Sequence, residues 1–170
     1  MPVIKLPKGF KLSVARAGIK GSGLPIGKND MALIYSEDVS TIAGTFTTNK
    51  VVGAPVVMNK DKARRGKAQA IVVNSGNSNS CTGTQGMKDV LEMAALSASL
   101  LGIDEKLVYV CSTGVIGVPL PMPKVRKGLK ALAGGLGKAS VEAAARAIMT
   151  TDSYPKFISR TVKMATRSGA

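Results

Sequence analysis

Short apolar runs separated by glycine, proline, asparagine and aspartate dominate the first half of the chain. This punctuation is typical of β-strands joined by tight turns. The pattern predicts strands at Leu12–Ile19, Met31–Ser36, Thr41–Thr48 and Ala54–Met58. A further run, Gln69–Asn74, has a continuous apolar centre, which favours a strand buried on both faces.

Helical spacing begins after this buried strand. Apolar residues recur every three or four positions from Met87 to Leu101, and Gly102 follows at the place where a left-handed C-terminal residue is expected. Leu107–Ser112 then has the composition of another buried strand. The region Gln69–Ser112 is therefore predicted to form a strand–helix–strand unit.

The last third of the chain is predicted to be helical first and extended at its end. One helix opens at Pro121–Pro123, because proline fits a first turn, and it ends at Gly134–Gly135. Ser140 is expected to cap a further helix, with Glu142 favourable in its first turn. The alternating segment from Phe157 to Ala165 is expected to form a strand.

Composition places the chain among globular proteins. It has 170 residues, of which 45% are apolar and 20% charged, and it shows no internal repeat, so residues 1–170 are expected to form a single domain. The elements together predict an α/β fold with mixed sheets covered by helices. No apolar run approaches the ~20 residues of a membrane span, and the N-terminus lacks the features of a signal peptide. A soluble, cytoplasmic protein is therefore expected.

The absence of histidine and the scarcity of cysteine restrict the chemistry of the chain. Without histidine, the chain by itself builds no Ser-His-Asp or Cys-His arrangement and lacks the commonest metal ligand. Cys81 and Cys111 form no CxxC motif, so no metal site is expected, and two buried free thiols are the simplest interpretation. Any catalysis must use another base.

The net charge of +14 favours an anionic partner, either nucleic acid or an acidic subunit. Proteins that bind single strands interleave aromatic with basic residues, but the six aromatic residues of this chain are scattered. A small basic nucleic-acid-binding module is therefore the alternative function. Its expected contact residues are Lys124, Arg126, Lys127 and Lys130.

Two glycine-rich loops follow the predicted buried strands, where ligand sites of α/β folds tend to open. The first loop, Asn74–Gly83, is either part of a site or a tight, self-bonded turn. The second loop, Cys111–Gly117, places Thr113 beside Gly114. A threonine hydroxyl and a glycine N–H that point the same way would form a donor pair for an oxyanion. The alternative is a turn that only reverses the chain.

A third polar segment, Met149–Asp152, follows the last predicted helix. Asp152 can simply cap or turn the chain. Two adjacent hydroxyls, those of Thr150 and Thr151, beside a carboxylate can instead hold a polar amino-acid substrate.

Four ordered motifs resemble those of the ornithine acetyltransferase family, the bifunctional glutamate N-acetyltransferases of arginine biosynthesis. They are TFTTNKVVGAPV (Thr45–Val56), AIVVNSGNSNSCTG (Ala70–Gly83), VCSTGVIGVPLPM (Val110–Met122) and AIMTTDSYPK (Ala147–Lys156). The likeness extends from the N-terminal strands to about Val162. It implies a DmpA/ornithine acetyltransferase-like fold.

The resemblance also implies a mechanism. In this family a precursor cuts itself before a threonine, and the resulting α and β chains stay associated, here expected as an α2β2 assembly. The new N-terminal threonine accepts acetyl from N2-acetylornithine as an ester and passes it to glutamate in a ping-pong scheme. Its own α-amino group serves as the base, so no histidine is needed.

Site residues follow from the same resemblance. Thr113 and Gly114 match the oxyanion pair of the family, and Thr150 matches its substrate-contacting threonine, with Thr151 as the alternative. No metal and no cofactor are implied, and the use of acetyl-CoA as a second acetyl donor stays open. The expected partners are the β chain, N2-acetylornithine and glutamate, with no nucleic acid and no membrane.

One departure from the family pattern bears on activity. The family's cleavage dipeptide, Ala-Thr, follows a KGSGM-type stretch beyond the last motif, and this chain ends before such a stretch. Ala165–Thr166 lacks the expected surroundings. The chain is therefore expected to be a truncated α chain that is inactive without the β chain carrying the nucleophilic threonine.

Overall fold

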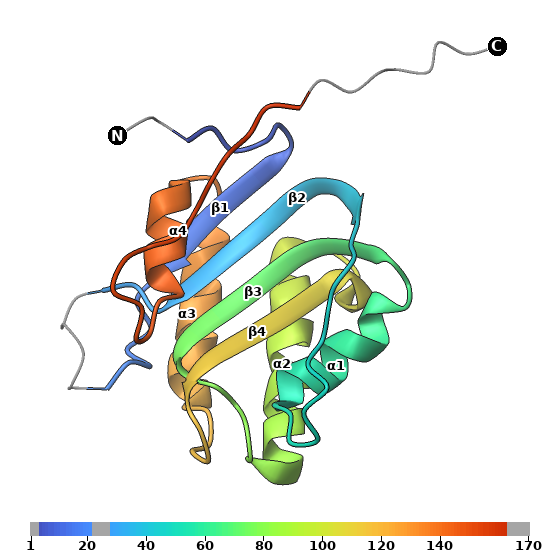
Figure 1. Ribbon diagram of the computed structural model, residues 1–170, viewed down its shortest axis with the longest axis vertical. Coiled ribbons are helices and arrows are strands. Elements are labelled where there is room, and N and C mark those ends of the chain that lie inside the picture. Colours follow the sequence, from blue (N-terminus) through green and yellow to red (C-terminus); the bar gives the residue numbers. More distant parts are fainter. Residues whose placement is uncertain (1–3, 22–27, 163–170) are drawn as a thin grey trace.

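A mixed four-stranded sheet forms the centre of the protein (Figure 1). The computed structural model describes residues 4–21 and 28–162. The strands are β1 (Phe10–Ala15), β2 (Met31–Thr41), β3 (Lys67–Asn77) and β4 (Val108–Val115), in the spatial order β1-β2-β3-β4. β2 is antiparallel to β1 and to β3, whereas β3 and β4 are parallel.

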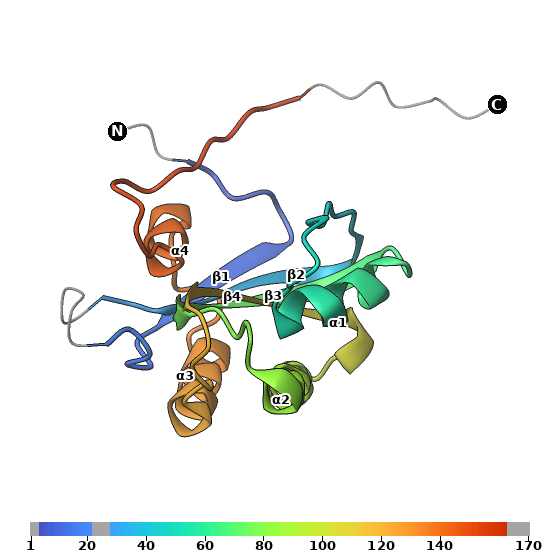
Figure 2. The same ribbon diagram turned by 60° about the horizontal axis from the view of Figure 1, so that its bottom comes forward.

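Helices lie on both faces of this sheet (Figure 2). On one face are α1 (Ala54–Ala63), α2 (Gly83–Leu101) and α3 (Met122–Gly134), and a 3₁₀ turn, η1 (Glu105–Leu107), leads from α2 into β4. On the other face α4 (Val141–Ala147) packs over β1 and β2. The predicted α/β fold with a mixed sheet covered by helices is confirmed.

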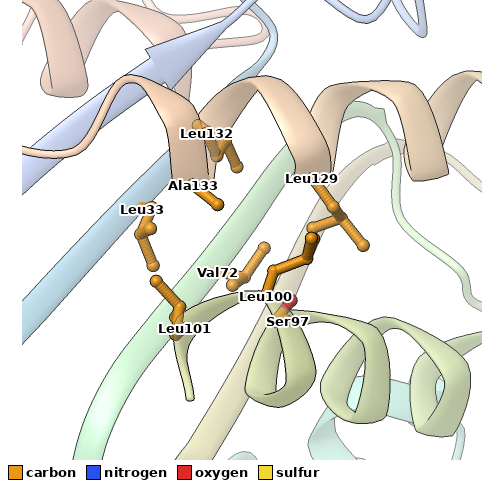
Figure 3. A pocket seen from close by; sticks show the side chains of 8 residues that line it. All are labelled: Leu33, Val72, Ser97, Leu100, Leu101, Leu129, Leu132 and Ala133. Carbon is orange, nitrogen blue, oxygen red and sulfur yellow. The ribbon is translucent and has the colours of Figure 1, made fainter. Parts of the chain in front are cut away.

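The main core lies between the sheet and the first three helices. Side chains from alternate strand positions meet apolar stripes of α2 and α3, among them Leu33, Val72, Val110, Val90, Met93, Val125 and Leu129. Between α2 and α3 a void of only about 10 Å³ remains, below or at the size that admits one water molecule (Figure 3). The interface between α2, α3 and the sheet is therefore close-packed.

Several local signals in the sequence predict what the structure contains. Gly102 has a left-handed conformation, with φ 67°, at the end of α2. The Ser140 hydroxyl accepts a hydrogen bond of 3.1 Å from the N–H of Ala143 and caps α4. α3 begins at the predicted prolines, and Gln69–Ser112 contains the predicted strand–helix–strand unit.

The predicted strand at Ala54–Met58 is wrong, because this segment begins α1. Pro55 fits the first turn of the helix. In the next turn the Asn59 side-chain amide donates to the carbonyl of Val110 at 2.8 Å and thereby ties the helix to β4. A contact with a strand far along the chain thus fixes the element.

The structure contains the strands predicted at Met31–Ser36, Gln69–Asn74 and Leu107–Ser112 and extends them to Thr41, Asn77 and Val115, whereas two other predicted strands end earlier than expected. β1 ends at Ala15 rather than Ile19, and of Thr41–Thr48 only Thr41 belongs to a strand. Local bonds replace the ladder after it: the Asn49 side-chain oxygen, for example, accepts from the N–H of Val51 at 2.9 Å. Residues 157–162 form no strand either, and residues 163–166 lie outside the described part of the chain.

Candidate functional site

The candidate oxyanion residues lie where the parallel strands β3 and β4 end together. In the register of this pair, Ser75 is opposite Thr113 and Gly76 is opposite Gly114. Thr113 and Gly114 are half-buried, and Val115, the next residue, is 58% exposed. Both residues therefore sit at an accessible edge of the sheet and are not sealed in the core.

Gly114 has a backbone conformation that only glycine adopts easily. Its φ is +136°, and a Cβ atom at this position would come within 2.3 Å of the carbonyl carbon of Gly76. The two strands touch at this point. Within the described residues the Thr113 hydroxyl makes no hydrogen bond, whereas the neighbouring Ser112 hydroxyl donates to the Asn74 side-chain oxygen at 2.6 Å. The oxyanion role of Thr113 and Gly114 stays a prediction.

The loop that follows β3 forms a network of hydrogen bonds with itself and with its neighbours. The Asn77 amide donates to the carbonyl of Val118 at 2.9 Å, and its oxygen accepts from the N–H of Asn79 at 2.8 Å. The Asn79 amide in turn donates to the carbonyl of Gly86 at 2.8 Å, and its oxygen accepts from the Thr82 hydroxyl at 2.6 Å. Of the two interpretations of Asn74–Gly83, the structure favours the tight, self-bonded turn.

This loop also holds the segment that follows Gly114. The backbone N–H and the hydroxyl of Ser78 both donate to the carbonyl of Val115, at 3.0 and 2.9 Å, and the N–H of Gly117 donates to the carbonyl of Ser80 at 2.8 Å. Two of its residues other than glycine, Asn79 and Cys81, have positive φ values of 49° and 56°. The loop therefore supports the end of β4.

The MTTD segment follows the end of α4, which contacts β3 at Ser75. The Ser75 hydroxyl donates to the carbonyl of Ala147, the last residue of α4, at 2.5 Å. Thr150 is half-buried and Thr151 is exposed. The ammonium of Lys156, 2.5 Å from the Asp152 carboxylate, lowers the pKa of Asp152 together with the backbone of Thr150. Asp152 is thus an ionised group beside the two hydroxyls.

Sequence reasoning missed two residues close to this edge, Asp30 and Lys20. Asp30 is only 1% exposed, and its carboxylate accepts from the backbone N–H groups of Ala17 and Ile19, both at 2.6 Å. Burial lowers the pKa of Lys20, against the opposing charge of Asp30. The only available signal was a single acidic residue next to the apolar run that begins at Met31.

The structure shows how exposed the two cysteines are and whether acidic and thiol side chains cluster as metal ligands would. Cys81 and Cys111 are both exposed, so the predicted burial of the two thiols is wrong. Partial burial of the Cys111 thiol still raises its pKa by desolvation. Over residues 4–21 and 28–162, no three cysteine, aspartate or glutamate side chains gather closely enough to hold a metal ion.

Thr113 lines neither of the two larger surface hollows. One, of about 360 Å³, lies between Lys50–Ala54 and Cys81–Met87, and another, of about 110 Å³, lies over β2 and β3 beside Phe10.

None of the helices in the described part of the chain combines the length and the apolar character needed to cross a bilayer.

The basic face of α3 is partly neutralised. Arg126 forms two hydrogen bonds with the carboxylate of Glu92, at 2.5 and 3.0 Å, and the Lys124 ammonium donates to the carbonyl of Gly18 at 2.8 Å. Two of the four residues expected to contact nucleic acid are therefore engaged within the chain, and nothing in the described residues favours that alternative.

The mixed sheet and its helices have the fold of ornithine acetyltransferases. The described chain superposes on the ornithine acetyltransferase of Mycobacterium tuberculosis, solved in complex with ornithine, with a TM-score of 0.80 and 38% identity over 86% of this chain and 78% of that one. The model of the ArgJ family matches residues 11–169, and the chain belongs to this family. The resemblance stated from the motifs is confirmed.

Relatives with curated descriptions agree with this assignment. The arginine biosynthesis bifunctional protein ArgJ of Caldanaerobacter subterraneus subsp. tengcongensis is 54% identical over 155 residues, which cover 91% of this chain and 37% of that protein. The ArgJ protein of Geobacter sulfurreducens is 48% identical over 154 residues, 91% of this chain and 38% of that protein. A crystal structure of ArgJ from Bacillus halodurans gives a TM-score of 0.78 at 36% identity, over 86% of this chain and 74% of that one. The chain thus spans little more than a third of the length of these curated relatives.

Proposed function

We propose that this chain is the α-chain part of an acetyltransferase that moves acetyl from N2-acetylornithine to glutamate in arginine biosynthesis. The names of its relatives and the ornithine complex of a structural neighbour support this substrate class. The observation that carries the proposal is the place of Thr113 and Gly114 at the accessible end of β4, with Gly114 in a backbone conformation that only glycine adopts easily.

The two donors act where negative charge develops. When the nucleophile attacks the acetyl carbonyl, the carbonyl oxygen becomes an oxyanion, and donors held in place beforehand stabilise it without reorganising. The Thr113 hydroxyl and the Gly114 N–H both donate to this oxygen. The strand geometry requires glycine at position 114, because a Cβ there would meet the backbone of Gly76, and this close contact fixes the position of the Gly114 amide.

The transfer runs in two balanced half-reactions. The hydroxyl of an N-terminal threonine on the β chain attacks, its α-amino group takes the proton, and the C–N bond of N2-acetylornithine breaks as the ornithine amine receives that proton. The amine of glutamate then attacks the acetyl-threonine ester, and the threonine oxygen leaves as an alcohol. Acetyl-CoA as a further donor would enter through the same ester.

The remaining roles divide between the chains. This chain supplies the oxyanion donors and, through Thr150 or Thr151, a contact to the amino-acid substrate, while the β chain supplies nucleophile and base. The scheme needs no metal or cofactor. We place the enzyme in the cytoplasm as an α2β2 assembly.

Purification of the complete enzyme tests this proposal. Intact mass and N-terminal sequencing of everything that copurifies with this chain should reveal a second polypeptide that begins with threonine. The complex should transfer acetyl from N2-acetylornithine to glutamate, and this chain alone should not. Turnover by the isolated chain would contradict the division of labour.

A further inference from the structure

A single backbone carbonyl joins three parts of the chain at the strand edge. The carbonyl oxygen of Ala147 lies 2.5 Å from the Ser75 hydroxyl and 3.4 Å from the Lys20 ammonium nitrogen. Ala147 is 1% exposed and Ser75 is fully buried, so water does not compete for this oxygen. The two side chains together hold the end of α4 against the sheet.

The same two residues belong to the backbone that supports the oxyanion pair. Ser75 is the register partner of Thr113. A Cβ on Gly76 would lie 2.9 Å from the backbone nitrogen of Lys20, and a Cβ on Gly114 would lie 2.3 Å from the carbonyl carbon of Gly76. The backbones at Lys20, Gly76 and Gly114 are therefore stacked in direct contact.

The buried Asp30 carboxylate fixes the course of the chain around Lys20. It accepts from the N–H groups of Ile19 at 2.6 Å and of Lys20 at 3.3 Å. The carbonyl of Asn29 accepts from the Lys20 ammonium at 3.4 Å. With its backbone and its ammonium both engaged, the Lys20 side chain is directed toward the end of α4.

We propose that Lys20 and Ser75 are positioning residues that set the place of the substrate-contacting segment relative to the oxyanion pair, through their shared acceptor, the Ala147 carbonyl. The inference rests on the proposed function, since Thr150 or Thr151 must contact the amino-acid substrate. Only Ile148 and Met149 separate Ala147 from Thr150, so a shift at the end of α4 reaches Thr150 directly. A displacement of this kind weakens substrate binding and leaves the oxyanion donors in place.

Variants of the complete enzyme test this inference through the split between KM and kcat. Ser75→Ala and Lys20→Met should each raise the KM for N2-acetylornithine about fivefold, the loss of roughly one hydrogen bond, with kcat within about twofold. Lys20→Arg keeps a charged donor and should restore most of the affinity. Lys127→Met, which removes a charge from an exposed position of α3, is the matched control and should change neither constant.

The double variant tests the shared acceptor. Because each single variant leaves one donor on the Ala147 carbonyl, Ser75→Ala with Lys20→Met should raise KM by more than the product of the two single effects. A KM increase in the double variant equal to the product of the two single increases would mean that the residues act independently, and it would overturn the shared role. Unchanged KM with a lower melting temperature would show a merely structural role and would also overturn it. If Lys20→Met does not fold, Ser75→Ala decides alone, and an unchanged KM in that variant overturns the proposal.

Thr113→Ala in the same assay separates this inference from the proposed function. A normal kcat in Thr113→Ala would defeat the proposed oxyanion role. A low kcat in Thr113→Ala together with normal KM values in the Ser75 and Lys20 variants would defeat only the positioning role.

Discussion

Gly114 lies directly on Gly76, so close that a Cβ on Gly114 would stand 2.3 Å from the carbonyl carbon of Gly76 and 2.5 Å from the backbone nitrogen of Asn77. Both glycines have positive φ, +136° and +103°. The edge that carries the candidate site is thus a contact between two backbones, and its geometry depends on the absence of side chains at both positions.

Gly114→Ala should destabilise the chain more than a glycine substitution that only strains the backbone. The new methyl group meets backbone atoms that cannot move aside, in addition to the cost of positive φ, for a total of about 3 kcal/mol of unfolding free energy. Gly117→Ala is the matched control: φ is +79° but no atom lies within 4 Å of the added Cβ, so about 1 kcal/mol is expected. Urea unfolding measures both, and equal losses would contradict the close contact.

Asp30→Asn should be strongly destabilising although it changes few atoms. The buried carboxylate accepts two backbone N–H groups at 2.6 Å, and an amide would turn an NH2 group toward one of them. A loss of about 3 kcal/mol is expected, in the range for hydrogen bonds to charged groups. Asp61→Asn, at an exposed position 3.8 Å from Arg64, should cost less than about 0.5 kcal/mol. Similar losses in both variants would show that Asp30 does not organise the turn.

Lys62 should make the chain more stable as the pH rises through the alkaline range. Burial lowers the pKa of Lys62 in the folded chain. Between this lowered value and the ordinary value of the unfolded chain, the unfolded state binds more protons, so this group makes the unfolding free energy rise with pH. The neutral amine still donates to the carbonyls of Glu105 and Val108, at 2.8 and 2.9 Å.

Urea unfolding from about pH 8 to about pH 10 measures this effect. The unfolding free energy of the unmodified chain minus that of Lys62→Met should rise with pH. Lys60→Met, at an exposed position of the same helix, is the matched control for loss of a lysine. A constant difference for Lys62→Met would contradict the lowered pKa.

Cys111 should react slowly with iodoacetamide at neutral pH despite its exposure. Desolvation raises the pKa of its thiol, and only the thiolate is nucleophilic. Peptide mass spectrometry after alkylation over a pH series should place the midpoint of the Cys111 profile above that of a cysteine in a short peptide. Cys111→Ser, which leaves only Cys81, identifies the contribution of each thiol, and a midpoint at or below the peptide value would refute the raised pKa.

The sequence predicts those elements whose signals are local. The periodic residues from Met87 to Leu101 and the left-handed Gly102 suffice to define α2, because spacing and terminal conformation are properties of the segment itself. The strand prediction for Ala54–Met58 is wrong because a short apolar run fits either a strand or a helix. The hydrogen bond between Asn59 and Val110 favours the helix over the strand. These residues are far apart in the sequence, so no local pattern predicts their contact.

In the candidate site, too, residues with a local sequence signal are predicted, and residues that depend on long-range contacts are not. Thr113 and Gly114 were predicted as neighbours in a glycine-rich loop after a strand, and the structure places them at the end of β4. The sequence does not single out Asp30 and Lys20, because the partners of these residues, such as the Ala147 carbonyl for Lys20, become neighbours only when the chain folds.

The kcat of Thr113 variants in the complete enzyme tests the central claim most directly. Thr113→Ala removes the hydroxyl donor and should lower kcat by roughly 100- to 1,000-fold, while Thr113→Ser keeps the hydroxyl and should stay within about tenfold of the unmodified enzyme. A kcat for Thr113→Ala equal to that of the unmodified enzyme, or to that of Thr113→Ser, would contradict the assignment of this hydroxyl to the oxyanion.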